Sequence, residues 1–348
     1  MATLDFMALL KEEKRKAQEV AASKNKSSGH NGSNTSASTS SPIPVANARV
    51  LPSNTIDFPS FTFAPRPGIN LDDLSVSSVP TISYVSSFVS RSEAMAICAM
   101  IEAVPVDHPR WTQLRGRRLQ CWGGIPLRAT TAAESPVKTA PTVQEVLPAW
   151  LLRLCDALVE AGVFPSSEAP NHVLINRYEN GEGILGHTDG PLYKARTATL
   201  SLAMSLTTQH PSLEEEPDEL SSTPPLGAVM TFQRRQPTSE VGILPAPPVA
   251  CEVALLDRSL VVFAGPAYMD HLHAIADRSG SSNRDAEAEA VASPPPHSAG
   301  VFDTVGESAL LANAEATGLT SGDVLWRPTV RYSLTFRHFI HLDGPQVD

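Results

Sequence analysis

Hydrophobic residues follow two different periods along the chain, and the change falls near residue 171. Before this point, residues 90–104 and 149–164 repeat their apolar positions every three or four residues, which is typical of amphipathic helices. After it, short apolar or alternating runs predict strands at residues 172–178, 197–206, 228–233, 252–256, 259–265 and 331–339. Helices first and many short strands later indicate an α+β domain, in which helices buttress a β-sandwich or barrel.

Composition divides the chain into three regions. An apolar start followed by charged residues predicts a short helix over residues 1–22, which is either a partner-binding segment or a frayed tail. Residues 23–79 are rich in Ser, Asn, Thr and Pro and are expected to form a flexible linker. The folded domain is expected over residues 80–345, with an acidic surface insertion at residues 210–224 and a low-complexity insertion at residues 278–322.

Charge and cysteine content limit the possible functions. The formal net charge is −10, so contact with long nucleic acid would need a local basic patch. The four cysteines show no metal-ligand spacing, which favours reduced thiols and a location in the cytoplasm and nucleus. No apolar run is long enough to span a membrane, and the start of the sequence has no pattern of a secretory signal.

A candidate metal site lies at His187 and Asp189, after a predicted strand and a glycine-rich turn. On a strand, residues two apart point to the same face, so an imidazole and a carboxylate can reach one ion. One further histidine would complete a triad that leaves three coordination positions open, which non-haem Fe(II) needs to bind a co-substrate and O₂. A structural zinc site would more often use cysteines, and none lies near these residues.

The third ligand is expected just after the strand at residues 259–265. His271 and His273 both lie there, and because they share the same strand parity, periodicity does not choose between them. The chain has a second His-x-Asp step at His341 and Asp343, but no histidine follows it, so we interpret it as a chance match. For any single histidine, a place in the core or on the surface is the simpler interpretation.

The strand RYSLTFR at residues 331–337 is a second candidate feature. Arg331 and Arg337 share one face with the two hydroxyl residues between them, while three apolar residues share the other face. A buried arginine needs an anionic partner, and a dicarboxylate such as 2-oxoglutarate supplies one at each end. An exposed strand with surface charges is the alternative. By the same parity, Asn176 and Tyr178 share a face and could hydrogen-bond the same ligand.

Three segments resemble the AlkB family of Fe(II)- and 2-oxoglutarate-dependent dioxygenases, namely LINRYENGEGILGHTDGPLY, GPAYMDHLHAI and RYSLTFR. The stretches WTQLRGRRLQCWGGIPL and NHVLINRYENGEGILGHTDGPLY are similar to the AlkB homologue six subfamily. The resemblance covers residues 80–345 apart from the two insertions. It implies a double-stranded β-helix, or jelly roll, with helices packed on one sheet and a nucleotide-recognition-type lid near residues 109–127.

The resemblance also implies roles for individual residues. It favours His273 over His271, because His273 aligns with the histidine of the family's His-Gly-Ile step, which reads His-Ala-Ile here. Many family members have Asn where this chain has Ser333, so that contact departs from the family pattern. The implied iron ligands are His187, Asp189 and His273, and the residues implied to line 2-oxoglutarate are Asn176, Tyr178, Arg331, Ser333 and Arg337.

The expected lid is where a substrate would be recognised. Arg115, Arg117 and Arg118, with Arg110 nearby, form a basic patch in an otherwise acidic chain, and Trp122 is a candidate for stacking on a base. Core packing explains Trp122 equally well, and it is the favoured interpretation for Trp111. The arginines could likewise be solvated surface residues.

These features together predict a monomeric dioxygenase that removes alkyl groups from nucleic acid by oxidation. One alternative is a dioxygenase that acts on a protein side chain, which the acidic net charge mildly favours. Another is a nucleic-acid- or protein-binding adaptor with little catalysis, which the complete set of candidate ligands disfavours.

Overall fold

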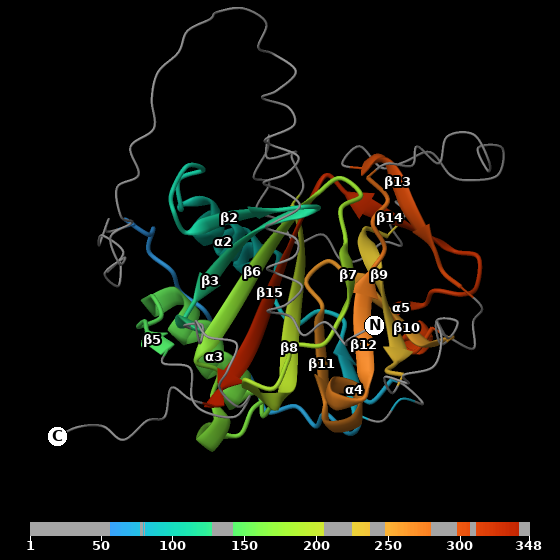
Figure 1. Ribbon diagram of the computed structural model, residues 1–348, viewed down its shortest axis with the longest axis horizontal. Coiled ribbons are helices and arrows are strands. Elements are labelled where there is room, and N and C mark those ends of the chain that lie inside the picture. Colours follow the sequence, from blue (N-terminus) through green and yellow to red (C-terminus); the bar gives the residue numbers. More distant parts are fainter. Residues whose placement is uncertain are drawn as a thin grey trace, which may run out of the picture.

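Two antiparallel β-sheets form the centre of the computed structural model (Figure 1). It describes residues 56–76, 79, 81–126, 142–204, 225–236, 248–279, 298–306 and 311–340. The larger sheet contains, in spatial order, β1 (Ile82–Val85), β11 (Leu260–Ala264), β8 (Tyr193–Met204), β15 (Val330–Phe339), β6 (His172–Glu179), β3 (Arg117–Trp122) and β2 (Trp111–Leu114). The smaller sheet contains β10 (Val249–Leu256), β9 (Gly227–Arg234), β12 (His271–Ile275) and β7 (Ile184–His187).

Eight of these strands wind between the two sheets. The strands β6, β8, β11 and β15 belong to the larger sheet, and β7, β9, β10 and β12, which lie between them along the chain, belong to the smaller one. This arrangement of antiparallel strands in two facing sheets is a jelly roll. The fold class that the sequence predicts is therefore confirmed at this level.

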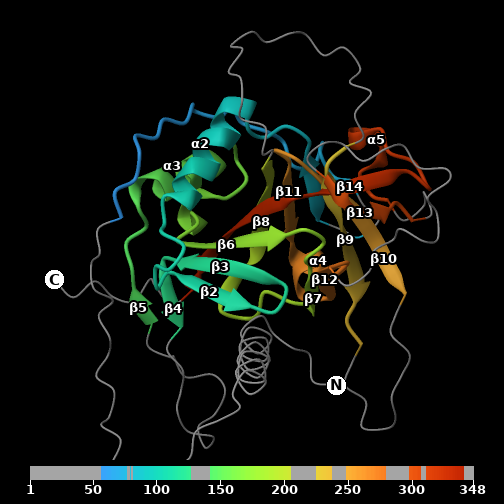
Figure 2. The same ribbon diagram turned by 90° about the horizontal axis from the view of Figure 1, so that it is seen from above.

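The outer face of the larger sheet is covered by helices α2 (Arg91–Glu102) and α3 (Ala149–Glu160), which lie on the same side of it (Figure 2). The side chain of Ser90 accepts a hydrogen bond from the backbone N–H of Glu93, and the Glu93 carboxylate accepts one from the backbone N–H of Ser90. This capping box supplies partners for backbone groups that a helix start otherwise leaves open. The apolar faces of both helices join the main core.

The remaining elements are short. Two strand pairs lie outside the jelly roll, and single turns of helix connect its strands. They are β4 (Gly124–Pro126) with β5 (Thr142–Gln144), β13 (Ser298–Thr304) with β14 (Val324–Pro328), and the helices η1 (Ser166–Glu168), α4 (Gly265–Met269) and α5 (Ala314–Thr317). No helix of the described residues has the length and apolar character that crossing a membrane requires.

Residues 56–76 correct the expectation of a linker reaching residue 79. Phe63 is buried, and the Phe58 ring lies 6.1 Å from the ring of Trp122 and 6.0 Å from that of Trp150. Three phenylalanines within this stretch bury enough apolar area to hold it against α3 and the larger sheet. The average composition of residues 23–79 hides these anchors. Residues 1–55, including the predicted N-terminal helix, lie outside the described residues.

The predicted insertion at residues 278–322 needs a similar correction. Its residues 298–304 form β13, which pairs with β14, and Asp303 makes a buried ion pair with Arg327. The carboxylate of Asp303 also accepts the backbone N–H of Val229 on β9 at 2.8 Å. This end of the segment is therefore part of the fold, because buried charges of this kind need fixed partners. Residues 280–297 and the whole predicted insertion at 210–224 lie outside the described residues.

Candidate metal centre and co-substrate pocket

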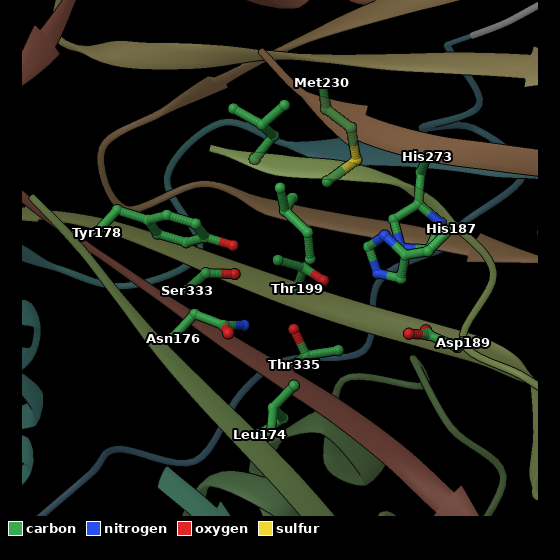
Figure 3. Close-up of a pocket in the computed structure, with 12 residues that line it drawn as sticks. Leu174, Asn176, Tyr178, His187, Asp189, Thr199, Met230, His273, Ser333 and Thr335 are labelled. Carbon is green, nitrogen blue, oxygen red and sulfur yellow. The ribbon is translucent and has the colours of Figure 1, made fainter. Parts of the chain in front are cut away.

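Three of the predicted site residues meet between the two sheets. One ligand atom from each of His187, Asp189 and His273 lies within 4.8 Å of the others, and all three residues are buried. His187 on β7 and His273 on β12 are direct cross-strand partners, which places their ring centroids 4.2 Å apart. Figure 3 shows the two imidazoles side by side at one end of a pocket, with the Asp189 carboxylate near them.

The environment of the two histidines suits metal binding. Burial lowers the pKa of His187 well below its usual value, with the neighbouring His273 as a further cause, and burial likewise lowers the pKa of His273. Both rings are therefore neutral, which is the form that binds metal. Nδ1 of His187 lies 2.8 Å from the carbonyl oxygen of Leu185, and since a carbonyl only accepts, this nitrogen carries the proton. Nε2 of His187 is left with the lone pair that a metal needs.

Asp189 is held as a charged carboxylate. Burial raises its pKa, but its charged and hydrogen-bonding neighbours, chiefly the Arg337 guanidinium and also the Thr197 hydroxyl, outweigh burial and lower the pKa to about 2. Nη1 of Arg337 donates to Oδ1 of Asp189 at 2.8 Å, and Oγ1 of Thr197 donates to Oδ2 at 2.6 Å. Two imidazole nitrogens and one carboxylate oxygen form the donor set of a facial triad, and they fit Fe(II).

Beside the pocket, next to the lining residue Tyr178, lies a guanidinium suited to an anion. Arg331 is 3% exposed, and neither Nη1 nor Nη2 has a hydrogen-bond partner among the described residues. Its guanidinium carbon lies 4.4 Å from the centre of the Tyr178 ring, and burial lowers its pKa to about 10, so it remains charged at neutral pH. A buried charge with open donors is costly unless an anion occupies the space in front of it. A carboxylate group fits this requirement.

The pocket itself mixes hydroxyl and apolar groups. Asn176, Tyr178 and Ser333 line it opposite the histidines, as Figure 3 shows. Strand parity predicted these three residues and also placed the hydroxyl residue Thr335, which lines the pocket, on the same face. The same parity would have found Leu174. The lining residues that the sequence argument missed are Leu174, Ile184, Thr199, Met230 and Ile275.

Arg337 differs in part from its predicted role. It shares the strand face of Arg331, as expected, but its guanidinium pairs with Asp189 and lies 4.3 Å from the centre of the Tyr193 ring. Arg337 pairs with Asp189 because Asp189 follows β7 and lies opposite the end of β15, where it can neutralise the fully buried Arg337. Contact between Arg337 and 2-oxoglutarate stays a prediction.

The predicted lid residues do not form one basic and aromatic surface. Trp122 is only 4% exposed, and its Nε1 donates to Oε1 of Gln120 at 3.0 Å, so the prediction that it stacks on a base is wrong. Trp122 lies on the face of β3 that packs toward the helices, with Arg110 over its ring at 4.0 Å. Arg117 is fully buried, and its Nε donates to Oδ1 of Asn176 at 3.1 Å.

Two arginines of the lid prediction remain near the surface. Arg115 is exposed in the turn between β2 and β3. Arg118 is partly buried: its guanidinium lies 4.8 Å from the centre of the Trp111 ring and donates to the carbonyl of Val106. Only Arg115 is therefore placed as a solvent-facing group that a phosphate could approach without rearrangement.

Comparison with known proteins adds one strong likeness. No protein-family model matches the chain. A protein of Danio rerio named "Probable RNA/DNA demethylase ALKBH6" is 31% identical over 261 residues, which cover 74% of this chain and 86% of the relative. Identity and coverage of this size are sufficient to assign a family.

Solved structures give weaker likenesses. The structure of OsALKBH1 is 12% identical and covers 74% of this chain and 98% of that one, with a TM-score of 0.38. An oxidoreductase of the 2OG-Fe(II) oxygenase family from Burkholderia pseudomallei is 12% identical and covers 80% of this chain and 94% of that one, with a TM-score of 0.39. Similarities of this size carry no further argument about the site.

Proposed function

Because this chain belongs to the AlkB family of Fe(II)- and 2-oxoglutarate-dependent dioxygenases, in the group of AlkB homologue six, we propose that it removes alkyl groups from nucleic acid by oxidation. The observation that carries this proposal is the meeting of His187, Asp189 and His273 at one end of a buried pocket. The relative from Danio rerio, whose name describes a probable RNA/DNA demethylase, supports nucleic acid as the substrate class.

In this proposal the residues in and beside the pocket divide into two groups. His187, Asp189 and His273 hold Fe(II), and Arg331 with Tyr178 binds the carboxylate of 2-oxoglutarate farthest from the metal. Iron bound with 2-oxoglutarate and O₂ supplies the oxidation of an N-alkyl carbon, which then leaves as an aldehyde. The remaining work of the chain is to orient both substrates and exclude water. The apolar lining groups of Leu174, Ile184, Met230 and Ile275 suit that role.

We keep one part of the predicted lid, the turn between β2 and β3, as a contact for nucleic acid. The turn between β2 and β3 lies close to the β6–β7 connection: a Cβ built at Gly116 would be 3.5 Å from the carbonyl oxygen of Gly183. The same hairpin carries the exposed Arg115 at its tip. We propose that Arg115 contacts the phosphate backbone beside the pocket, while the buried Arg117 supports Asn176 from behind.

Nucleic-acid demethylation is tested by supplying the complete chain with Fe(II), 2-oxoglutarate and oligonucleotides that carry N-methylated bases. Loss of the methyl mass together with succinate formation is expected, and an unmethylated oligonucleotide of the same sequence should give neither. Succinate formation stimulated by methylated peptides but not by oligonucleotides would instead support a protein-directed dioxygenase. Binding of Fe(II) and 2-oxoglutarate without turnover on any of these substrates would support an adaptor.

Arg331→Met is expected to raise the KM for 2-oxoglutarate by about 100-fold, because a two-pronged charged hydrogen bond contributes on the order of 3 kcal/mol. Succinate formation measured over a range of 2-oxoglutarate concentrations gives this KM. Arg153→Met, which removes a half-buried arginine of α3 that pairs with Glu160, is the matched control and should leave the KM unchanged. An unchanged KM for Arg331→Met would contradict the assignment of Arg331 to the binding of 2-oxoglutarate.

Three further expectations from the sequence are kept as proposals. They are a monomeric protein, a location in the cytoplasm and nucleus, and a protein partner for the predicted helix of residues 1–22.

A further inference from the structure

Two residues of the larger sheet hold the Asp189 carboxylate at both oxygens. Thr197 on β8 donates its hydroxyl to Oδ2 at 2.6 Å, and Arg337 on β15 donates to Oδ1 at 2.8 Å. Thr197 and Arg337 are direct cross-strand partners, so their side chains leave the sheet at the same point. Asp189 follows β7, which belongs to the smaller sheet. Two residues of the larger sheet therefore hydrogen-bond one carboxylate that follows a strand of the smaller sheet.

These two hydrogen bonds determine the plane of the Asp189 carboxylate. The terminal torsion of an Asp side chain has a broad range of values when nothing restrains it. Each carboxylate oxygen has two lone pairs, so one donor per oxygen fixes the plane and still leaves a lone pair for a metal. Thr197 and Arg337 are fully buried and Asp189 is 4% exposed, so water does not compete for these bonds. Arg337 contributes charge as well as orientation, whereas the neutral Thr197 contributes orientation alone.

We propose that Thr197 is a positioning residue of the metal centre, whose hydroxyl fixes the Asp189 carboxylate in the plane that presents it to the two histidines. The proposal rests on the proposed function, since it takes Asp189 as an iron ligand. Thr197 lies outside every motif that the sequence argument used. It is found only through its bond to Asp189 and its register with Arg337.

Metal affinity of the complete chain tests this role without any need for turnover. Co(II) serves as the probe, titrated without oxygen and followed by its visible absorption. Thr197→Val, which removes the hydroxyl and keeps the shape, is expected to weaken Co(II) binding by about 10- to 100-fold, the usual effect of losing a hydrogen bond to a ligand. Thr197→Ser, which keeps the hydroxyl, should bind Co(II) nearly as tightly as the unaltered chain.

A matched control lies on the same strand. Ser201→Ala also removes a buried hydroxyl from β8. Because the Ser201 hydroxyl makes no hydrogen bond to Asp189, this variant should leave Co(II) affinity unchanged. Circular dichroism checks the fold of each variant. If Thr197→Val does not fold, Thr197→Ala compared with Thr197→Ser makes the same test.

The possible results separate this role from others. Wild-type affinity in folded Thr197→Val would overturn the proposal, and so would equal weakening in Thr197→Ser, because packing rather than the hydroxyl would then be responsible. Failure of the unaltered chain to bind Co(II) would overturn the metal centre itself and this role with it. Tight metal binding without demethylation would contradict only the proposed substrate.

Discussion

His273→Ala is expected to abolish succinate formation from 2-oxoglutarate, whereas His271→Ala is expected to retain most of it. The two histidines lie on the same strand, but their surroundings differ. His273 is the cross-strand partner of His187 and offers a nitrogen to the shared site. His271 directs Nδ1 to the carbonyl oxygen of Pro266 at 3.0 Å and does not belong to the cluster. Removing a ligand leaves too few donors to hold Fe(II) in a fixed geometry.

The two variants are closely matched because each removes one imidazole from β12. Turnover is measured as succinate formation at saturating Fe(II) and 2-oxoglutarate, and circular dichroism establishes that both variants fold. Full activity in His273→Ala would refute the triad. Loss of activity in a folded His271→Ala would move the third ligand to that position.

Asp303→Ala is expected to lower the free energy of unfolding by about 3–5 kcal/mol, because it leaves Arg327 charged and buried without its partner. Asp303 is 1% exposed and Arg327 is 2% exposed, and the Asp303 carboxylate accepts hydrogen bonds from Nε and Nη2 of Arg327 at 2.7 and 3.0 Å. Arg327 also donates to the carbonyl oxygens of Glu182 at 3.2 Å and Ala276 at 3.0 Å. One guanidinium thus ties the β13–β14 pair to two connections beside the pocket. Urea unfolding measures the loss.

Two controls separate a buried ion pair from a general effect of mutation. Asp73→Ala removes an exposed carboxylate and should change the free energy of unfolding by less than about 0.5 kcal/mol. Combining Asp303→Ala with Arg327→Met should recover part of the lost stability, since the unpaired charge disappears. A loss below about 1 kcal/mol for Asp303→Ala would indicate that this end of residues 278–322 is a surface attachment, as its composition suggested.

Strand periodicity accounts for much of what the sequence could predict. A period of two placed Asn176 beside Tyr178, and Arg331 and Ser333 on one face, because both neighbouring strands are regular and buried. The same rule could not choose between His271 and His273. Their difference arises from the pairing of β12 with β7, which is a property of strands distant in the sequence. The resemblance to a family supplied the choice that periodicity lacked.

The errors share a physical cause as well. Averages over composition treated residues 56–76 as linker, although Phe58 and Phe63 pack against the core. They also treated Asp303 as part of a loop, because its partner Arg327 lies beyond the segment. From the sequence, stacking on a base and packing in the core explained Trp122 equally well. On β3 its side chain lies on the face opposite to that of Arg117, and this face packs in the core. Each case depends on a contact that local patterns do not contain.

Because His187 and His273 are cross-strand partners, metal binding depends on the native register between β7 and β12. The pairing between β7 and β12 is irregular, since Ile275 faces Ile184 rather than the residue two before His187. A slip of one residue would turn one imidazole to the opposite face and disassemble the donor set. Only the native alignment of these strands can then capture the ion, so bound metal selects that alignment from its misaligned competitors.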